Sequence, residues 1–294
     1  MDKRDSTCKL LKLNSTSDGF DSGKDSSFDK YILDSVKNGK TDFIIAGGNT
    51  SINYFLNRCI DLLTPETLRQ LKLGAVGIGF SNDYHKPFSD HNIIESLPCN
   101  LNFKKAAERD VGCIQYESNG KLLKKYFLIS ANIGITARGN YLFNNPDFIL
   151  KCLKKTKSQG ATAYTIFKNI LTYKNFKINF EINDELFTAN VSNLGILKSP
   201  YFSGKSKFQS DPLPDNGLLD VHLLELSSKV KLLKLFYKLS KGKSTKLFNN
   251  KFWRTNRIKV YSQKEFVIEF DGEIINTKHA LFSVIPGLIK VCTN

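Results

Sequence analysis

Two adjacent glycines mark the stretch of the chain with the clearest chemical meaning. Gly47 and Gly48 end the apolar run Phe43–Ala46, and small polar residues at positions 49–51 precede a helical pattern. Glycine lets a backbone approach a ligand closely, and the N–H groups at a helix N-terminus bind phosphate. The stretch therefore predicts a nucleotide-phosphate site, although an ordinary tight strand–helix turn has the same composition.

Two later turns carry polar side chains directly after apolar runs. Gly79 follows the run Leu73–Ile78, and Asn82-Asp83 comes next. A second run, Phe266–Phe270, ends in Asp271-Gly272-Glu273. A carboxylate held in position can act as a general base. Asn-Asp and Asp-Gly pairs also form local turns without any catalytic role, so both interpretations stay open from the residues alone.

The first hundred residues must position the glycine turns, and their pattern alternates between strand and helix. This alternation predicts a parallel sheet with helices on its faces, which binds ligands at the carboxyl ends of its strands. Thr50 or Ser51 is the expected N-cap of the helix that follows Gly48. The expected elements are strands at Cys8–Leu13, Phe43–Ala46 and Leu73–Ile78 and helices at 28–36 and Ser51–Leu63.

Beyond about residue 100 the pattern changes to many short apolar or alternating runs separated by turn residues. Such a pattern predicts an antiparallel β-sandwich or barrel-like domain, here with helical exceptions at Phe148–Thr172 and Lys229–Lys241. The predicted fold is an α/β nucleotide-binding domain over residues 1–100 and a β-rich domain over 101–285; a return of the tail 286–294 to the first domain stays open. The expected strands are Val111–Tyr116, Tyr126–Ile133, Phe176–Ile182, Leu186–Val191, Gly217–Leu226, Ile258–Tyr261, Phe266–Phe270 and Leu281–Val284.

Positive charge is concentrated in the second part of the chain. The formal net charge of +15 divides into −1 for residues 1–96 (12 Lys/Arg against 13 Asp/Glu) and +16 for residues 97–294 (31 against 15). Such a surface is expected to meet phosphates or an anionic membrane, although lysines spread along a chain can also serve only to solvate it. No aromatic-basic motif of a nucleic-acid module is present, so no nucleic-acid partner is expected.

Composition disfavours several other classes of protein. The six cysteines are scattered without a C-x-x-C pair and do not cluster with the four histidines, which argues against a zinc site. No apolar run approaches the ~18 residues of a membrane-spanning helix, and the N-terminus shows no signal-peptide core. We expect a soluble, cytoplasmic protein, and a homodimer stays open.

Six sequence elements, taken in order, resemble the diacylglycerol kinase catalytic family, which contains bacterial diacylglycerol and lipid kinases and sphingosine kinases. The family signature G-G-D-G-T-L-N is similar to Gly47–Asn53, and P-L-G-T-x-N-D-F is similar to Gly77–Tyr84. Asn14–Ser17 is a weak counterpart of the family's opening N-P-x-S-G. The elements D-V-G, F-x-N-x-x-x-x-G-x-x-A, D-D-G-L-L-D-V and D-G-E resemble Asp110–Gly112, Phe127–Ala137, Asp215–Val221 and Asp271–Glu273.

The resemblance implies a Rossmann-like nucleotide domain followed by a β-rich lipid-substrate domain. It implies transfer of the γ-phosphoryl group of ATP to the hydroxyl of a diacylglycerol-like lipid, with Mg²⁺, by an enzyme attached peripherally to an anionic membrane. Asp271 and Glu273 would supply the acid–base chemistry. The metal would lie at Asp215, Asn216 and Leu218, and the nucleotide at Gly47, Gly48, Asn49, Thr50, Ser51, Asn53, Gly79, Asn82 and Asn14.

Three departures from the family pattern remove charge or hydrogen-bonding capacity. Asn49 and Asn216 stand where the family has aspartates, and Phe80 replaces a phosphate-contacting threonine. An amide keeps a carbonyl acceptor, but Mg²⁺ prefers carboxylate oxygen and an amide cannot act as a base. The alternative function is therefore a pseudokinase that binds nucleotide or lipid without phosphoryl transfer. An NAD kinase-like enzyme is disfavoured by the D-G-L-L-D-V and D-G-E elements.

Overall fold

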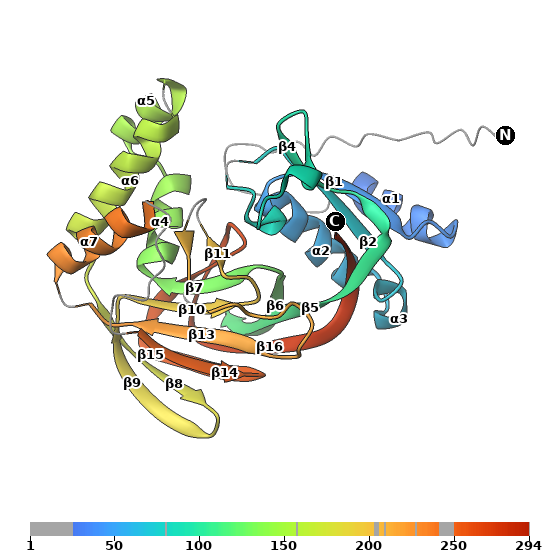
Figure 1. Ribbon diagram of the computed structural model, residues 1–294. Helices are drawn as coiled ribbons and strands as arrows, with labels where there is room; N and C mark the ends of the chain where they lie inside the picture. The colour runs from blue at the N-terminus through green and yellow to red at the C-terminus, as the bar shows by residue number, and fades with distance from the viewer. Residues whose placement is uncertain are drawn as a thin grey trace. The chain divides into compact units, whose positions relative to one another are not determined.

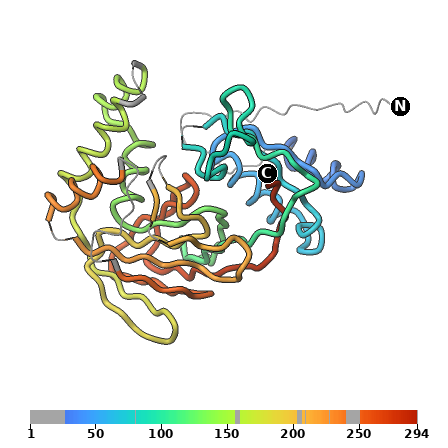
Figure 2. Tube along the Cα trace, viewed as in Figure 1, coloured from blue at the N-terminus to red at the C-terminus, as the bar shows by residue number. Residues whose placement is uncertain are grey.

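The computed structural model describes residues 26–79, 81–156, 158–202, 206–208, 210–226, 228–240 and 250–293 (Figures 1 and 2). The chain divides into two compact units, Met1–Lys40 and Thr41–Asn294. The first unit contains helix α1 (Ser26–Lys37), which confirms the helix predicted over 28–36. Phe28 and Ile32, four residues apart, are both buried, as an amphipathic helix requires. The predicted strand Cys8–Leu13 and the predicted site residue Asn14 lie outside the described residues.

The second unit begins with two parallel strands whose carboxyl ends lie together. β1 (Asp42–Gly47) pairs with β2 (Lys72–Gly77), with Gly47 opposite Gly77. Helix α2 (Asn49–Leu62) and the short α3 (Pro65–Leu68) connect them. The predicted parallel pair is confirmed, and its register brings both glycine turns to one edge of the sheet.

The predicted N-cap of α2 is wrong. The helix begins at Asn49, and Gly48 is its N-cap, with an extended backbone (φ −93°, ψ −171°). The Gly48 carbonyl accepts the N–H groups of Ser51 at 3.1 Å and Ile52 at 3.2 Å. Glycine serves as an N-cap because its carbonyl can start the helix, but it offers no side chain to the first-turn N–H groups.

Most of the second unit belongs to one large, mostly antiparallel sheet with fourteen strands among the described residues. Its long hairpin joins β15 (Arg257–Phe270) to β16 (Glu273–Thr293), and β16 also pairs with β5 (Asn102–Ser118). The last residues of β16 pair in parallel with β2, Lys290 opposite Lys72. The mixed α/β class with a large antiparallel part is confirmed. The boundary near residue 100 falls between β4 and β5, inside this unit, and the two-domain division stays a prediction.

The remaining strands extend the sheet on both sides of the hairpin. Alternate side chains of β8, such as Ile178, Phe180 and Ile182, enter a core that also holds Phe270 and Phe282. A separate pair of strands, β11 (Tyr201–Phe202) and β12 (Ser206–Lys207), lies off the main sheet. The main sheet also contains β3 (Ile93–Ile94), β4 (Leu97–Asn100), β6 (Lys121–Phe127), β7 (Ser130–Gly134), β8 (Phe176–Ile182), β9 (Glu185–Val191), β10 (Asn193–Leu197), β13 (Leu219–Leu224) and β14 (Asn250–Thr255).

Two strand predictions differ from the structure. The run Tyr126–Ile133 is divided between two strands, β6 and β7. The strands separate because the N–H groups of Leu128 and Ile129 donate to the Asp271 carboxylate and not to a neighbouring strand. The runs 258–261 and 266–270 are one strand, β15, with a register shift between them. The residues on each side of these strand ends are largely apolar and buried, so hydrophobicity alone does not show where a strand stops.

Four helices form a layer of their own beside the large sheet (Figure 1). The predicted helical run Phe148–Thr172 is two helices, α5 (Phe148–Thr156) and α6 (Ser158–Thr172), and both α5 and α7 (Lys229–Ser240) pack on α6. Helix α4 (Ile135–Asn144) was not predicted. None of the helices within the described ranges has the length and hydrophobicity that crossing a membrane would require. Two short 3₁₀ turns, η1 (Asp83–His85) and η2 (Asp90–Asn92), follow β2.

Candidate functional site

Three turns meet in direct contact at the carboxyl ends of β1 and β2. A Cβ atom built on Gly79 would lie 2.5 Å from the Cα of Gly48, so the two glycine turns touch backbone to backbone. A Cβ atom on Gly272, between β15 and β16, would lie 2.2 Å from Thr50 Oγ1 at the start of α2. At these distances a side chain on either glycine would force a neighbouring atom to move, so glycine is what lets the turns lie this close.

Asn49 ties the first turn to the second. Its Nδ2 atom donates to Asp83 Oδ2 at 3.1 Å and to Ser81 Oγ at 3.2 Å. Its Oδ1 atom accepts the N–H of Tyr84 at 3.3 Å. An amide can donate and accept in this way, whereas a carboxylate could only accept. The residue that departs from the family signature therefore has a role in holding the two turns together.

Asn82 closes the second turn on itself. Its Oδ1 atom accepts the N–H of Gly79 and its Nδ2 atom donates to the carbonyl of Gly77, both at 3.0 Å. Its φ of +46° is one that asparagine tolerates better than most residues. The next residue, Asp83, ties this turn to the first turn through its contact with Asn49.

Asp271 is held by four N–H donors. Its carboxylate is only 4% exposed, and Asp271 and Gly272 both have positive φ (47° and 98°), as in the hairpin turns that favour Asp-Gly. Burial raises the pKa of Asp271 to about 6, while its hydrogen bonds oppose the rise. Asp271 therefore fixes the third turn to α2 and to the β6–β7 connection. The donors are the N–H groups of Leu128 (2.7 Å), Ile129 (3.0 Å) and Ser130 (3.1 Å) and Asn53 Nδ2 (3.2 Å).

Glu269 is a site residue that sequence reasoning missed. It is 8% exposed; its carboxylate accepts the Gly272 N–H and Asn132 Nδ2, both at 2.9 Å. Burial raises its pKa to about 7, and the nearby charge of Asp271 adds to the rise. A charged residue inside the apolar strand Phe266–Phe270, two positions before Asp271 and hence on the same face, is the signal that could have indicated it.

Glu273 is the more accessible of the two predicted catalytic carboxylates. It is half-buried at the first position of β16, opposite Phe270. Burial raises its pKa, and the nearby charge of Lys125 opposes the rise. A carboxylate with a raised pKa and partial exposure has the properties of a general base.

The other predicted nucleotide-binding residues surround the start of α2. Thr50 Oγ1 lies 3.5 Å from the Asp271 carbonyl, and Asn53 Nδ2 donates to the carbonyl of Tyr126 at 2.7 Å. No side chain caps the N-terminus of α2. The N–H groups of Asn49 and Thr50, which precede the first one that the Gly48 carbonyl accepts, are therefore the natural place for an oxyanion beside the Thr50 and Ser51 hydroxyls.

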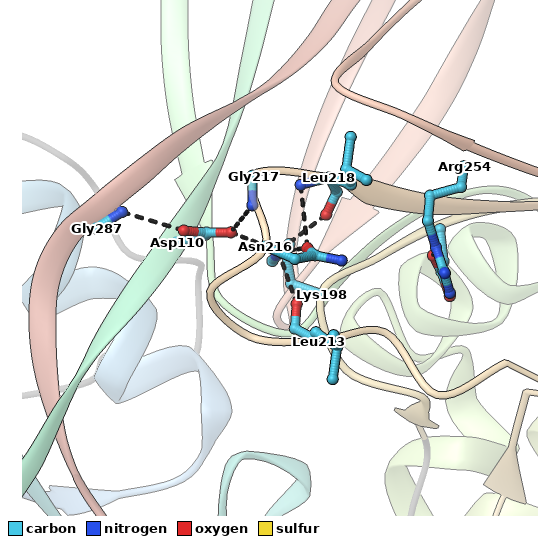
Figure 3. Close-up of polar contacts among 9 residues, drawn as sticks. Asp110, Lys198, Leu213, Asn216, Gly217, Leu218, Arg254 and Gly287 are labelled. Atoms are coloured by element: carbon cyan, nitrogen blue, oxygen red, sulfur yellow. Dashed lines mark hydrogen bonds and ion pairs between the residues drawn. The ribbon is translucent and has the colours of Figure 1, made fainter.

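The residues predicted to hold a metal ion surround a lysine. Asn216 Oδ1 and the Leu218 carbonyl both accept hydrogen bonds from Lys198 Nζ (Figure 3). Asp215 precedes them in the same loop and takes no part in the contacts of Lys198. Across the described part of the chain, no group of three or more His, Cys, Asp or Glu side chains is arranged to hold a metal ion.

Arg109 is a second residue that the sequence did not single out. It is half-buried, and within the described residues its Nε atom is buried without a hydrogen-bond partner. Burial lowers the pKa of Arg109, and the charges of Asp110, Asp271 and Asp215 oppose that shift. The guanidinium therefore carries positive charge close enough to interact with these three carboxylates.

The fold is similar to that of solved structures from one bacterium. A structure described as a diacylglycerol kinase from Bacillus anthracis str. Sterne is 14% identical, with a TM-score of 0.61, over 92% of this chain and 82% of the other. Two structures assigned as diacylglycerol kinases of that organism give TM-scores of 0.64 at 18% identity and 0.61 at 16% identity. The alignments cover 92% of this chain in both cases and 82% and 83% of the other chains.

Comparison of sequences identifies a family for the second half of the chain. No curated protein matches the chain. Residues 132–293, more than half of the chain, match the family described as the YegS C-terminal NAD kinase β-sandwich-like domain. The matched segment runs from β7 to β16 and includes Glu269, Asp271 and Glu273. The chain therefore belongs to the diacylglycerol kinase-like family whose members carry the YegS C-terminal domain.

Proposed function

We propose that this protein is an ATP-dependent kinase that phosphorylates the hydroxyl of a diacylglycerol-like lipid. The observation that carries the proposal is the contact among the turns at Gly48, Gly79 and Gly272. Two of these turns follow parallel strands, which is where Rossmann-like sheets bind nucleotide phosphates, and the third brings carboxylates to the same place. We accordingly assign nucleotide binding to a Rossmann-like part around β1 and β2 and lipid binding to the part that follows.

In this proposal the residues divide between phosphate binding and proton transfer. The first-turn N–H groups of α2, beside Thr50 and Ser51, hold phosphate oxygens with the help of the helix dipole. The lipid hydroxyl oxygen bonds to the γ-phosphorus, the bond from that phosphorus to ADP breaks, and the hydroxyl proton passes to the Glu273 carboxylate. Mg²⁺ bound to the nucleotide phosphates would supply charge neutralisation, since the described residues contain no carboxylate cluster arranged to hold it.

Radiolabelled phosphate transfer from ATP to diacylglycerol, or to a mixed lipid extract, tests the enzyme. Wild-type activity should fall by about 10²–10⁴-fold in Glu273→Gln, the usual contribution of a general base. Glu265→Gln is the matched control, because Glu265 is an exposed glutamate of the same hairpin, on β15. Equal activity of the two variants would contradict the role of Glu273.

A pseudokinase is the second candidate, and the contacts of Asn49 favour it. The Asn49 amide is engaged with Asp83 and Ser81 and brings no negative charge to the nucleotide loop. In the same assay, activity that is absent from the wild type and appears only in Asn49→Asp with Asn216→Asp would support the pseudokinase. Activity in the wild type that depends on Glu273 would exclude it.

We also propose that helices α5–α7 attach the protein peripherally to an anionic membrane. Phe148 on α5 is 81% exposed, and Val230, Leu233 and Tyr237 follow one exposed face of α7. Helix α5 contains three lysines and α7 four, and neither contains an acidic residue. Exposed apolar side chains beside lysines are the combination that binds an anionic lipid surface. Asn140 of α4 donates to the Gly272 carbonyl at 3.3 Å, which connects this helical layer to the third turn.

Vesicle co-sedimentation tests the membrane proposal. Binding to vesicles with anionic lipid should weaken steeply with added salt and should be lost in Phe148→Glu with Tyr237→Glu. Leu122→Glu with Leu186→Glu is the matched control, since these leucines are 65% and 66% exposed but lie on strands β6 and β9. Salt-insensitive binding, or an equal loss in the control, would contradict the assignment to α5–α7.

A further inference from the structure

Lys198 places an ammonium group where the family resemblance places a metal ion. The lysine follows β10, and its side chain is 0% exposed. Its four partners are oxygen acceptors, and the ammonium has three N–H donors, so one N–H is shared between two of the oxygens (Figure 3). Its partners are Asp110 Oδ2 at 2.8 Å, the Leu213 carbonyl at 2.9 Å, the Leu218 carbonyl at 2.8 Å and Asn216 Oδ1 at 3.3 Å.

The oxygen cage around Lys198 fits an ammonium ion and does not fit Mg²⁺. Mg²⁺ requires near-octahedral oxygens at about 2.0–2.1 Å, whereas these oxygens lie at hydrogen-bond distances from Nζ. A divalent ion in the same cage would also meet the positive charge of Lys198 at short range. The buried carboxylate of Asp220 is not among the ligands of Nζ and is paired with Arg254 at 2.7 Å.

The charges in the cage balance one to one, and this explains the departure at Asn216. Asp110 is the carboxylate that contacts Lys198, and both side chains are buried. A second carboxylate at position 216, which is half-buried, would share the one ammonium with Asp110 and lack a cation of its own, which is unfavourable. Burial lowers the pKa of the Lys198 ammonium, while the hydrogen bond to Asp110 opposes that shift. An asparagine contributes an oxygen ligand and leaves the pair neutral.

We propose that the Lys198 ammonium is a built-in cation that replaces the metal ion, so that the 213–218 loop folds and holds its place without Mg²⁺. The cage joins segments that are far apart in the chain. Asp110, at the centre of β5, also accepts the N–H of Gly217 at 2.7 Å and that of Gly287 in β16 at 3.1 Å. Lys198 thus fixes the loop that precedes β13 to the two longest strands. The inference goes beyond the kinase proposal and does not require phosphoryl transfer.

Thermal unfolding of the wild type with EDTA and with millimolar Mg²⁺ or Ca²⁺, in the absence of nucleotide, is the first measurement. We expect the same Tm in all three conditions and no heat of Mg²⁺ binding in calorimetry. A Mg²⁺-dependent rise in Tm that disappears in Asn216→Ala would overturn the proposal, because it would show a metal ion at this loop. This measurement does not depend on whether any Lys198 variant folds.

Lys198→Ala with Asn216→Asp is the complementary variant. It removes the ammonium and supplies a second carboxylate, so the oxygens that Nζ holds apart in the wild type can close on a divalent ion together with Asp110. In EDTA its Tm should fall by on the order of 10 °C, and Mg²⁺ or Ca²⁺ should recover several degrees. A folded variant without any response to either ion would overturn the proposal.

Lys86→Ala is the matched control for general effects of divalent ions. Lys86 forms a buried ion pair with Asp83 at 2.5 Å, with side chains 7% and 5% exposed, but belongs to the second glycine turn. Its loss should lower Tm without recovery by Mg²⁺ or Ca²⁺. Equal recovery in both variants would count against a specific cation site at Lys198. If the protein shows no kinase activity but its Tm responds to divalent ions as expected above, only the kinase proposal is contradicted.

Discussion

Replacing Asn49 by aspartate should destabilise the protein at neutral pH, although it restores the residue typical of the family signature. In the structure Asn49 Nδ2 donates to Asp83 Oδ2 at 3.1 Å. The variant places a carboxylate oxygen at that position, so an attractive contact becomes a repulsive one. Asp83 is 4% exposed, and water screens the new repulsion poorly.

The size of this effect follows from the distance. Two unit charges 3.1 Å apart repel by about 5 kcal/mol at an effective dielectric constant of about 20. Lys86, 2.5 Å from the other oxygen of Asp83, offsets part of this repulsion. The pair can avoid the repulsion by keeping one proton. Protonating a carboxyl that normally titrates near pH 4 costs about 4 kcal/mol at pH 7, so the destabilisation cannot exceed that value. We expect a loss of about 3 kcal/mol in the free energy of unfolding.

The pH dependence identifies the cause. A close pair of carboxyls keeps one proton to a higher pH than the unfolded chain does, so the native state of the variant binds more protons. Its stability relative to the wild type should therefore fall as pH rises above about 4 and recover below that pH, apart from the lost hydrogen bond. Urea unfolding at pH 4, 5.5 and 7 in EDTA measures this, with EDTA excluding a metal ion that could bridge the pair.

Asn49→Ala is the control, because it loses the same hydrogen bonds without adding charge. Its cost should be about 1–3 kcal/mol and nearly independent of pH. If Asn49→Asp is as stable as the wild type at pH 7 in EDTA, the geometry described for Asn49 and Asp83 is refuted. The same holds if the two variants show one common, pH-independent loss.

Three further perturbations test the third turn. Gly272→Ala should lower the free energy of unfolding in urea by about 2–4 kcal/mol, because its Cβ meets Thr50. The control is Gly120→Ala, at a hairpin glycine of φ +69° with nothing within 4 Å, which should cost about 1 kcal/mol from backbone strain. Equal losses would contradict the contact with Thr50. The pKa of Glu269 is raised from 4.5 to about 7, so the native state binds this proton more tightly and wild-type stability should fall as pH rises through that range. Glu269→Gln should make that fall shallower and leave the part due to Asp271, whose pKa is raised to about 6, and an unchanged slope would refute the assignment. Asp271→Ala should cost at least about 3 kcal/mol by thermal unfolding, because it leaves buried N–H groups unpaired, and a loss below about 1 kcal/mol would count against the four contacts.

Local sequence patterns were sufficient for the elements that carry the site. The glycines after Phe43–Ala46 and Leu73–Ile78 predicted the turns that follow β1 and β2, and their alternation with helices predicted a parallel pair. Asp271-Gly272 predicted a hairpin turn, which both positive φ angles confirm. These features depend on backbone freedom and on side-chain period within a few residues, so they are visible in one sequence.

Local sequence patterns did not predict where strands end when a contact from a distant part of the chain interrupts an apolar run. The run Tyr126–Ile133 is mostly apolar and is buried from Phe127 onward, yet its middle leaves the strand to donate N–H groups to Asp271, well over a hundred residues later. Helix α4 begins directly after Gly134 (φ +114°), where a Cβ would lie 2.5 Å from the Ser192 carbonyl oxygen. In both cases the deciding contact comes from a distant part of the chain.

The sequence by itself determined the family, the glycine turns and the carboxylates at the third turn. Only the tertiary structure decided that Asn49 donates to Asp83, that Glu269 lies beside Asp271, and that Lys198 occupies the position predicted for a metal. The physical reason is that the stability of a buried charge depends on its partners. Asp110 and Lys198 are 88 residues apart in the chain and 2.8 Å apart in the fold, and no local pattern records that distance.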